Sequence, residues 1–226
     1  MSDKEHYFKF NSKNTFCISV LTNTERWSRM EQRFNELNMS VTRFQASTPD
    51  DILKNKNNNL FASQLNIGQK CCALSHFRLW EQIFLSGLEY ALIIEDDARF
   101  DKDWIHKLQI ITRIIDGDWD AIFLNCSEPI DPAFTWKKIN EQYLTGAYII
   151  SKKGVINVLK MYYHTICASD WMTSRLQDRG NCYSYFPWLV IQDGTESTIG
   201  SNFNADHQKV VLCLKNINYS LEGNYV

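Results

Sequence analysis

Short apolar runs alternate with longer amphipathic stretches along this chain. Residues 16–21, 41–46 and 91–95 are short, apolar and partly β-branched, which is typical of buried strands. Thr24 can cap a helix that follows the first strand, and Gly87 can end a helix that precedes the third. Apolar side chains at helical spacing predict these two helices: Trp27, Met30, Phe34 and Leu37 in the first, and Leu74, Phe77, Trp80 and Ile83 in the second. This succession of strands and helices predicts a parallel sheet layered by helices.

The same alternation continues through the second half of the chain. We expect strands over residues 119–124, 143–151 and 183–192, and helices over residues 100–111, 152–163 and 168–179. Ser169 or Asp170 can cap the last of these helices. The Asn-rich stretch 49–59, in contrast, predicts a polar surface loop without chemistry.

The local sequence does not divide the chain into several domains. No internal repeat and no Pro/Gly-rich linker interrupts the pattern. We therefore expect a single α/β domain over residues 16–200. A polar extension over residues 1–15 would precede it, and a tail over residues 201–226 would pack on the same domain.

Charge and hydropathy exclude several classes of partner. The net charge of -2 and the pI of about 6.2 give no electrostatic reason for nucleic-acid binding. No run approaches the roughly 20 apolar residues of a membrane span, and the polar residues 1–14 lack the apolar core of a secretory signal. We expect a cytoplasmic or otherwise intracellular protein without a transmembrane segment. Peripheral association with a membrane is compatible with this expectation. Seven cysteines without a CxxC pair predict buried, reduced thiols. The oligomeric state has no signature in the sequence.

Residues 91–97, with the sequence ALIIEDD, place three acids at the end of an expected buried strand. In open α/β sheets, ligands gather at the carboxyl ends of the strands. Three carboxylates are tolerable there if they face water, pair with basic side chains, or bind a hard divalent cation. Strand alternation puts Glu95 and Asp97 on one side and Asp96 on the other. A GxGxxG and a P-loop are both missing after the first strand, so dinucleotide and P-loop sites lose their usual support.

Several motifs occur in an order that is more specific than any one of them. They are GQKCCALSH at residues 68–76, LIIEDD at residues 92–97, GAYIISKKG at residues 146–154, and the pair Ser169 and Asp170. Together they resemble the pattern of glycosyltransferase family 25, which includes bacterial lipooligosaccharide galactosyltransferases and procollagen galactosyltransferases. The resemblance covers about residues 16–200. Gln69 and Cys71 depart from the family's usual residues, and in the loop after the first strand only Arg26 is readily matched.

The resemblance implies a fold, a reaction and a cofactor. The fold would be GT-A-like, with a mostly parallel sheet, and the reaction would transfer galactose or glucose from a UDP-sugar with inversion. The acceptor would be a glycan, a lipid-linked glycan or a hydroxylysine-type side chain. Mn²⁺ or Mg²⁺ bound by Glu95 and Asp97 would stabilise the negative charge that builds up on the departing diphosphate. Cys71 and the missing arginines of the loop after the first strand motivate the alternative of a degenerate member that binds a nucleotide-sugar or glycan without catalysis.

The resemblance also assigns roles to individual residues. Inversion in a single displacement needs a base near the acceptor hydroxyl, and Asp170 is the candidate, with an ordinary helix N-cap as the alternative. The other implied positions are Arg26, His76, Asp96, Thr145 and Gly146 for the donor, and Gln192 for the acceptor. His76 could instead be a structural histidine, Arg26 a solvated helix residue, and Gln192 an ordinary loop residue.

Two further sets of side chains have more than one interpretation. His207 could be a third metal ligand, as C-terminal histidines are in some GT-A enzymes, or a solvated residue of the tail. Trp171, Phe186 and Trp188 could stack on sugar faces. In a chain that is 13% aromatic, however, the core is the favoured place for each of them.

Overall fold

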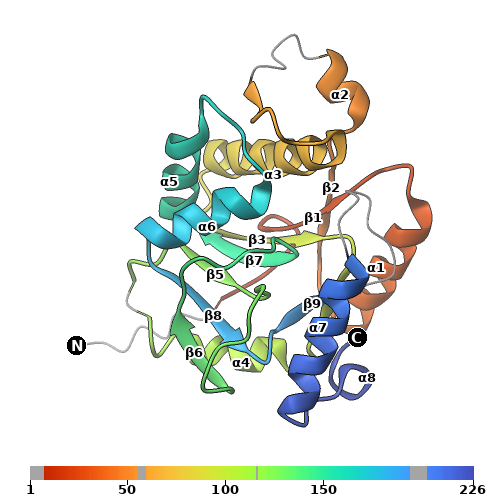
Figure 1. Cartoon of the computed structure of the whole chain (residues 1–226), viewed down its shortest axis with the longest axis vertical. Coiled ribbons are helices and arrows are strands. Elements are labelled where there is room, and N and C mark those ends of the chain that lie inside the picture. The colour runs from red at the N-terminus through yellow and green to blue at the C-terminus, as the bar shows by residue number, and fades with distance from the viewer. Residues whose placement is uncertain (1–7, 55–59, 116, 194–202) are drawn as a thin grey trace.

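The central feature of the fold is a seven-stranded sheet in the order β2-β1-β3-β7-β5-β8-β6 (Figure 1). The computed structural model describes residues 8–54, 60–115, 117–193 and 203–226, and within 203–206 only the backbone. The strands are β1 (Thr15–Ser19), β2 (Thr42–Gln45), β3 (Tyr90–Glu95), β5 (Ala121–Phe123), β6 (Thr135–Lys138), β7 (Ala147–Ser151) and β8 (Cys182–Phe186). The strand pairings give β2, β1, β3, β5 and β8 one direction, and β7 and β6 the opposite one. The predicted mixed α/β fold with a mostly parallel sheet is confirmed.

Helices cover both faces of this sheet. They are α1 (Thr24–Glu36), α2 (Pro49–Lys54), α3 (Ile67–Ser86), α4 (Trp104–Ile111), α5 (Lys152–Tyr162), α6 (Ser169–Arg179), α7 (Phe203–Asn216) and α8 (Leu221–Asn224). Figure 1 shows α3 and α5 on one side of the sheet and α4 on the other. Along β3 the side chains alternate accordingly: Ala91 and Ile93 join the core beneath α3, whereas Leu92 and Ile94 join the core beneath α1 and α4. Burial on both faces explains why this strand is a continuous apolar run.

A small second sheet lies directly after the three acids. β4 (Ala98–Phe100) pairs antiparallel with β9 (Val190–Gln192), so that Ala98 lies opposite Gln192. The backbone N–H of Asp193 donates to the carbonyl of Asp97 at 2.8 Å and extends this pairing. The end of β9 is thereby fixed beside the end of β3.

The last residues of the chain pack against this small sheet. Val226 and Phe100 exchange both backbone hydrogen bonds, at 2.9 and 3.0 Å. The hydroxyl of Tyr225 donates to the carbonyl of Trp188 at 2.6 Å. Leu214 of α7 and Tyr225 are both buried in the core beneath α3. Among the described residues, none of the helices combines the length and the apolar character that crossing a membrane requires.

Several predicted element boundaries are wrong. Residue 49 begins helix α2 and not a loop, because Asp51 accepts hydrogen bonds from both the backbone and the hydroxyl of Thr48 and so stabilises the helix start. Residues 55–59 of the same predicted loop lie outside the described residues. Phe100 belongs to β4, and the helix begins only at Trp104. The predicted strand over 183–192 is two strands, β8 and β9, with Pro187 between them.

The predicted helix caps are partly confirmed. Gly87 ends α3 in the left-handed conformation, with φ of 69°, as predicted. The N-cap of α1 is Asn23 and not Thr24, because the Asn23 side chain accepts from the backbone N–H of Arg26. Neither Ser169 nor Asp170 caps α6: both lie inside its first turn, and the cap residue makes no side-chain hydrogen bond.

Candidate functional site

A pocket of about 510 Å³ opens at the ends of β1 and β3, between α3, α6 and β9. It contains almost all of the site residues expected from the sequence: Arg26, His76, Glu95, Asp96, Asp97, Thr145, Asp170 and Gln192. Gly146 does not line the pocket but lies beneath it, where its carbonyl accepts from the backbone N–H of Glu95 at 2.8 Å. The fold therefore brings together side chains that are up to 166 positions apart, from Arg26 to Gln192.

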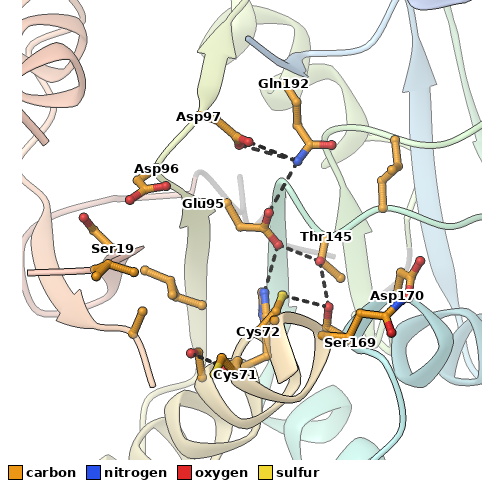
Figure 2. A pocket seen from close by; sticks show the side chains of 18 of the residues that line it. Ser19, Cys71, Cys72, Glu95, Asp96, Asp97, Thr145, Ser169, Asp170 and Gln192 are labelled. Atoms are coloured by element: carbon orange, nitrogen blue, oxygen red, sulfur yellow. Dashed lines mark hydrogen bonds and ion pairs between the residues drawn. The ribbon is translucent and has the colours of Figure 1, made fainter. Parts of the chain in front are cut away.

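The carboxylate of Glu95 is held from two sides (Figure 2). Its Oε1 lies 3.0 Å from Nε2 of His76 and accepts from the hydroxyl of Thr145 at 2.7 Å. Burial favours the protonated form, but the hydrogen bonds from His76 and Thr145 outweigh it and hold the pKa of Glu95 below its ordinary value. Glu95 is therefore an ionised carboxylate with a fixed orientation.

His76 is the buried end of a hydrogen-bonded chain. Its Nδ1 lies 2.9 Å from the hydroxyl of Tyr148, which accepts from Nε1 of Trp80 at 2.9 Å. Because a carboxylate can only accept, Nε2 of His76 carries the proton toward Glu95. In the neutral imidazole the Tyr148 hydroxyl then donates to Nδ1, and Trp80, Tyr148 and His76 all have hydrogen-bond partners. His76 has no exposed surface, so it positions Glu95.

Asp97 and Asp96 point in different directions. Nε2 of Gln192 lies 3.4 Å from both Oε2 of Glu95 and Oδ1 of Asp97, so these two carboxylates share one amide. Asp96 turns toward Ser19 instead (Figure 2). Arg26 contacts both aspartates, with Nη1 3.2 Å from Asp96 and Nη2 3.2 Å from Asp97. This is the division between the two sides of the strand that alternation predicts.

The acidic cluster carries more negative charge than its neighbours neutralise. Burial and the nearby charge of Glu95 raise the pKa of Asp97 to about 7, although Arg26 acts in the opposite direction. Burial likewise raises the pKa of Asp96, again against Arg26. Of the described cationic side chains, Arg26 contacts two of the three carboxylates, and Arg43 acts on Asp96 from farther away. Oxygen ligands with excess negative charge fit a hard divalent cation such as Mg²⁺ or Mn²⁺.

A second possible ligand group, made of Cys72, His76 and Glu95, fits a metal less well. Their ligand atoms lie within 4.8 Å of one another. However, His76 and Glu95 already bond to each other, and burial raises the pKa of the Cys72 thiol far above its ordinary value. Because His76 and Glu95 already satisfy each other, we interpret the group as a structural cluster. Cys72 contacts the hydroxyl of Ser169 at 3.4 Å.

Asp170 lies in the first turn of α6 and lines the pocket. Its Oδ1 accepts from the backbone N–H of Trp171 at 2.9 Å. Burial raises the pKa of Asp170, and the charge of Glu95 adds to this effect, while the bond from Trp171 opposes it. A carboxylate with a raised pKa is a stronger base than an exposed aspartate.

The remaining candidates are also placed by the structure. His207 is not a solvated tail residue: it lies on α7, is half-buried and lines the pocket. Phe186 and Trp188 are buried, as the core interpretation predicts, whereas Trp171 is 48% exposed and so lies outside the core. Gln69 completes a capping box with Asn66 at the start of α3, so this departure from the family pattern has a structural role.

Sequence reasoning missed Asn125 and Ser169 as site residues. Asn125 is 2% exposed and lines the pocket just after β5. The hydroxyl of Ser169 lies 3.2 Å from that of Thr145, which itself donates to Glu95. The available signal for Asn125 was a polar side chain that directly follows an apolar strand, the same signal that marks Glu95.

Comparison with known proteins gives a consistent set of matches. The sequence model of "Glycosyltransferase family 25 (LPS biosynthesis protein)" matches residues 12–173. The lipooligosaccharide biosynthesis protein lic2B of Haemophilus influenzae is 21% identical over 79% of this chain and 76% of its own length. Procollagen galactosyltransferase 1 of Danio rerio is 28% identical over 42% of this chain, but the match spans only 18% of that protein. The inactive glycosyltransferase 25 family member 3 of Homo sapiens is 33% identical over 26% of this chain and 11% of its own length.

Proposed function

Since the chain belongs to glycosyltransferase family 25, we propose that it transfers a hexose, galactose or glucose, from a UDP-sugar to a hydroxyl group of an acceptor. One observation carries this proposal: the carboxylates of Glu95 and Asp97 share the amide of Gln192 inside a pocket of about 510 Å³. A nucleotide-sugar presents a diphosphate, and a cation held by this pair would face it. Family membership supports the proposed class of reaction, and the acidic pocket supports the proposed location of the active site.

The cation that fits is Mn²⁺ or Mg²⁺, with Glu95 and Asp97 as its protein ligands. When bound, it would stabilise the negative charge of the diphosphate leaving group. Thr145 and His76 both bond Oε1 of Glu95, which leaves Oε2 as the oxygen on the side of Asp97 and Gln192. Arg26 bridges Asp96 and Asp97, with one terminal nitrogen on each, and offsets the repulsion between them. Asp96 then remains available for a ribose or sugar hydroxyl.

Asp170 is the proposed base. In a single displacement, the acceptor oxygen forms the new bond to the anomeric carbon while the bond from that carbon to the phosphate oxygen breaks. The proton of the acceptor hydroxyl passes to the carboxylate of Asp170, and the electron pair of the broken bond leaves with the diphosphate. This geometry inverts the anomeric carbon. The raised pKa of Asp170 favours proton acceptance, and its place on α6, apart from Asp97 in Figure 2, suits it to the acceptor side.

The acceptor that the comparisons favour is a glycan, including a glycan linked to a lipid. The match to the lipooligosaccharide biosynthesis protein spans 76% of that protein, whereas the match to the procollagen galactosyltransferase spans 18%. A hydroxylysine-type side chain is the alternative acceptor that the resemblance to the family implies, and the name of the second relative mentions procollagen. Both acceptors offer the same chemistry, a hydroxyl oxygen that attacks the anomeric carbon.

The test is turnover of UDP-galactose and UDP-glucose with Mn²⁺, with Mg²⁺, and with a chelator. We expect turnover of one donor that depends on the cation, and a loss of at least about 100-fold in Asp97→Asn. Asp118→Asn removes the same charge from an exposed surface pair and should behave as the parent. Equal turnover by the parent and Asp97→Asn would refute the metal role.

A second candidate function is binding of a nucleotide-sugar or glycan without catalysis. Two relatives carry the word "inactive" in their names, and Cys71 departs from the family pattern in this chain. The intact carboxylate pair and the ionised, oriented Glu95 favour the enzyme. A parent protein that binds a UDP-sugar in the presence of Mn²⁺, but turns over neither donor with any glycan or hydroxylysine acceptor, would establish the binding protein instead.

A further inference from the structure

Some residues that line the pocket carry buried hydrogen-bonding atoms without a partner in the protein. In the described part of the chain, five buried side-chain nitrogen or oxygen atoms have no hydrogen-bond partner. Three of them belong to residues that line this pocket: Nδ2 of Asn125, Nε1 of Trp188 and Nδ1 of His207. A buried donor without a partner costs about 1–3 kcal/mol, so such atoms are rare unless a ligand uses them.

Asn125 is the best defined of the three. Its side chain is buried, with 2% exposure, and its Oδ1 accepts from the backbone N–H of Ala147 at 3.0 Å. A backbone N–H can only donate, so the atom that faces Ala147 has to be the oxygen. The other atom of the amide is therefore the NH₂ group. The contact with Ala147 therefore identifies the atom without a partner, Nδ2, as a hydrogen-bond donor.

The surroundings of this NH₂ group place it at the floor of the pocket. A Cβ added to Gly146 would lie 2.8 Å from Nδ2 of Asn125 and 3.0 Å from Cγ of Gln192. The Asn125 amide thus lies beside the side chain of Gln192, whose own amide contacts Glu95 and Asp97. Glycine at position 146 leaves room for these two side chains to meet there.

The position across the sheet indicates which part of a substrate reaches Asn125. The pocket extends from Ser19 and Ser47, at the ends of β1 and β2, past the acids on β3 to Asn125 after β5. In the strand order, β7 separates β3 from β5, so Asn125 and the β1–β2 wall lie on opposite sides of the carboxylate pair. A diphosphate at the carboxylates that has its nucleoside on the β1–β2 side would place its sugar toward Asn125.

We infer that Nδ2 of Asn125 donates a hydrogen bond to a hydroxyl oxygen of the transferred hexose and selects the donor by that hydroxyl. This inference rests on the proposed function, because it takes a UDP-hexose as the ligand. A site that offers a buried donor to a sugar hydroxyl rejects an analogue without that hydroxyl, since the donor is then left unpaired.

The experiment compares Asn125→Asp with the parent on the preferred UDP-hexose and on analogues that each lack one hydroxyl. Aspartate keeps the oxygen that accepts from Ala147 and replaces the NH₂ donor by a second carboxylate oxygen, which only accepts when ionised. We expect the variant to lose about tenfold or more in kcat/KM on the full donor, and to show no further loss on one of the analogues. The parent should discriminate against that same analogue by a similar factor.

The added negative charge needs its own control. Asn140→Asp makes the same change at an exposed position outside the pocket and should leave kcat/KM unchanged. The Kd of UDP alone should be the same in Asn125→Asp and in the parent, because the inferred bond is to the sugar. The melting temperature without ligand reports whether the variant folds, and the parent's own discrimination among the analogues tests the inference if it does not.

Three results would overturn the inference. They are an unchanged kcat/KM in Asn125→Asp, an equal loss on every analogue, and a parent that accepts all the analogues equally. A parent that neither binds nor turns over any UDP-hexose would instead refute the proposed function, and the inference with it.

Discussion

Nε2 of His76 lies 3.0 Å from Oε1 of Glu95, and this contact joins the acidic cluster to the core of the protein. Behind His76, the hydroxyl of Tyr148 and the indole of Trp80 continue the chain of hydrogen bonds through fully buried side chains. The orientation of one carboxylate in the pocket is therefore set in part by side chains buried in the core. Buried networks of this kind are costly to interrupt, because each partner left behind is unsatisfied.

His76→Phe should lower both stability and cation affinity. The substitution leaves the Tyr148 hydroxyl without its acceptor and Glu95 without its main donor, which should cost about 2–3 kcal/mol in the free energy of unfolding. Urea unfolding measures the first effect, and titration with Mn²⁺ measures the second. The conservative change Tyr148→Phe leaves the contact with Glu95 in place, so it should reduce stability while affecting cation affinity less. An unchanged Mn²⁺ affinity in His76→Phe would show that the histidine has only a structural role.

Asp170→Asn should abolish transfer while leaving donor binding intact. The amide keeps the oxygen that accepts from Trp171 but cannot take a proton from the acceptor. We expect a fall of at least about 100-fold in kcat, with an unchanged Kd for the UDP-sugar measured by calorimetry. The exposed Asp178 lies on the same helix, and Asp178→Asn is the matched control. Transfer at the parental rate in Asp170→Asn would remove this residue as the base.

The raised pKa of Asp170 also predicts a pH dependence of stability. Its folded-state pKa lies above the unfolded value, so its protonated form adds stability at low pH, and this contribution disappears as the pH rises through the folded pKa. Asp170→Asn, which stays uncharged, should therefore be more stable than the parent near pH 8, and this difference in the free energy of unfolding should shrink toward pH 4. Urea unfolding at the two pH values checks this. If the variant and the parent differed in stability by the same amount at pH 4 and pH 8, ionisation of Asp170 would be excluded as the cause.

Two glycines of one sequence motif should respond differently to alanine. A Cβ at Gly154 would lie 2.2 Å from the backbone carbonyl oxygen of Asp120, which cannot move without disturbing β5, so Gly154→Ala should cost about 3 kcal/mol or more in the free energy of unfolding. A Cβ at Gly146 meets the side chains of Asn125 and Gln192 instead, so Gly146→Ala should fold but alter donor selectivity.

Gly117→Ala is the control for both glycines, because a Cβ there has no neighbour within 4 Å. Thermal unfolding and the ratio of rates on UDP-galactose and UDP-glucose separate the two effects. Comparable melting temperatures for Gly154→Ala and Gly117→Ala would contradict the predicted clash.

The elements that could be predicted are those with a local signal. β3 is buried on both faces and α3 carries a broad apolar stripe. Each of them therefore has a recognisable pattern of apolar residues in the sequence. β6 was missed because Trp136 is its one buried residue, and a polar edge strand has no apolar run. The pairing of β4 with β9 joins three-residue strands about 90 positions apart, and only tertiary packing decides such a contact.

The acids of the site were recognisable because three of them follow an apolar strand. Asn125 follows a strand in the same way, but as a single amide it gives a weaker signal, and its importance comes from the contact with Ala147 and from the space above Gly146. His207 is brought to the pocket by α7, whose position depends on the packing of Leu214 and of the residues after it. Neither the surroundings of Asn125 nor the position of His207 can be deduced from neighbouring residues in the sequence.

The contacts of the carboxylate pair also have a consequence for how the protein folds. Glu95 bonds to Thr145, 50 positions away, and shares with Asp97 the amide of Gln192, which is 97 positions from Glu95 and 95 from Asp97. Closing such long loops is slow, because the entropy cost comes before the contacts form. The hydrogen bonds of the carboxylate pair form only when β7 and β9 have both docked. The pocket should therefore acquire its final shape in the same cooperative step that completes the sheet. Hydrogen exchange at the backbone amide of Glu95, which bonds to the carbonyl of Gly146, should then report global unfolding and not a local opening.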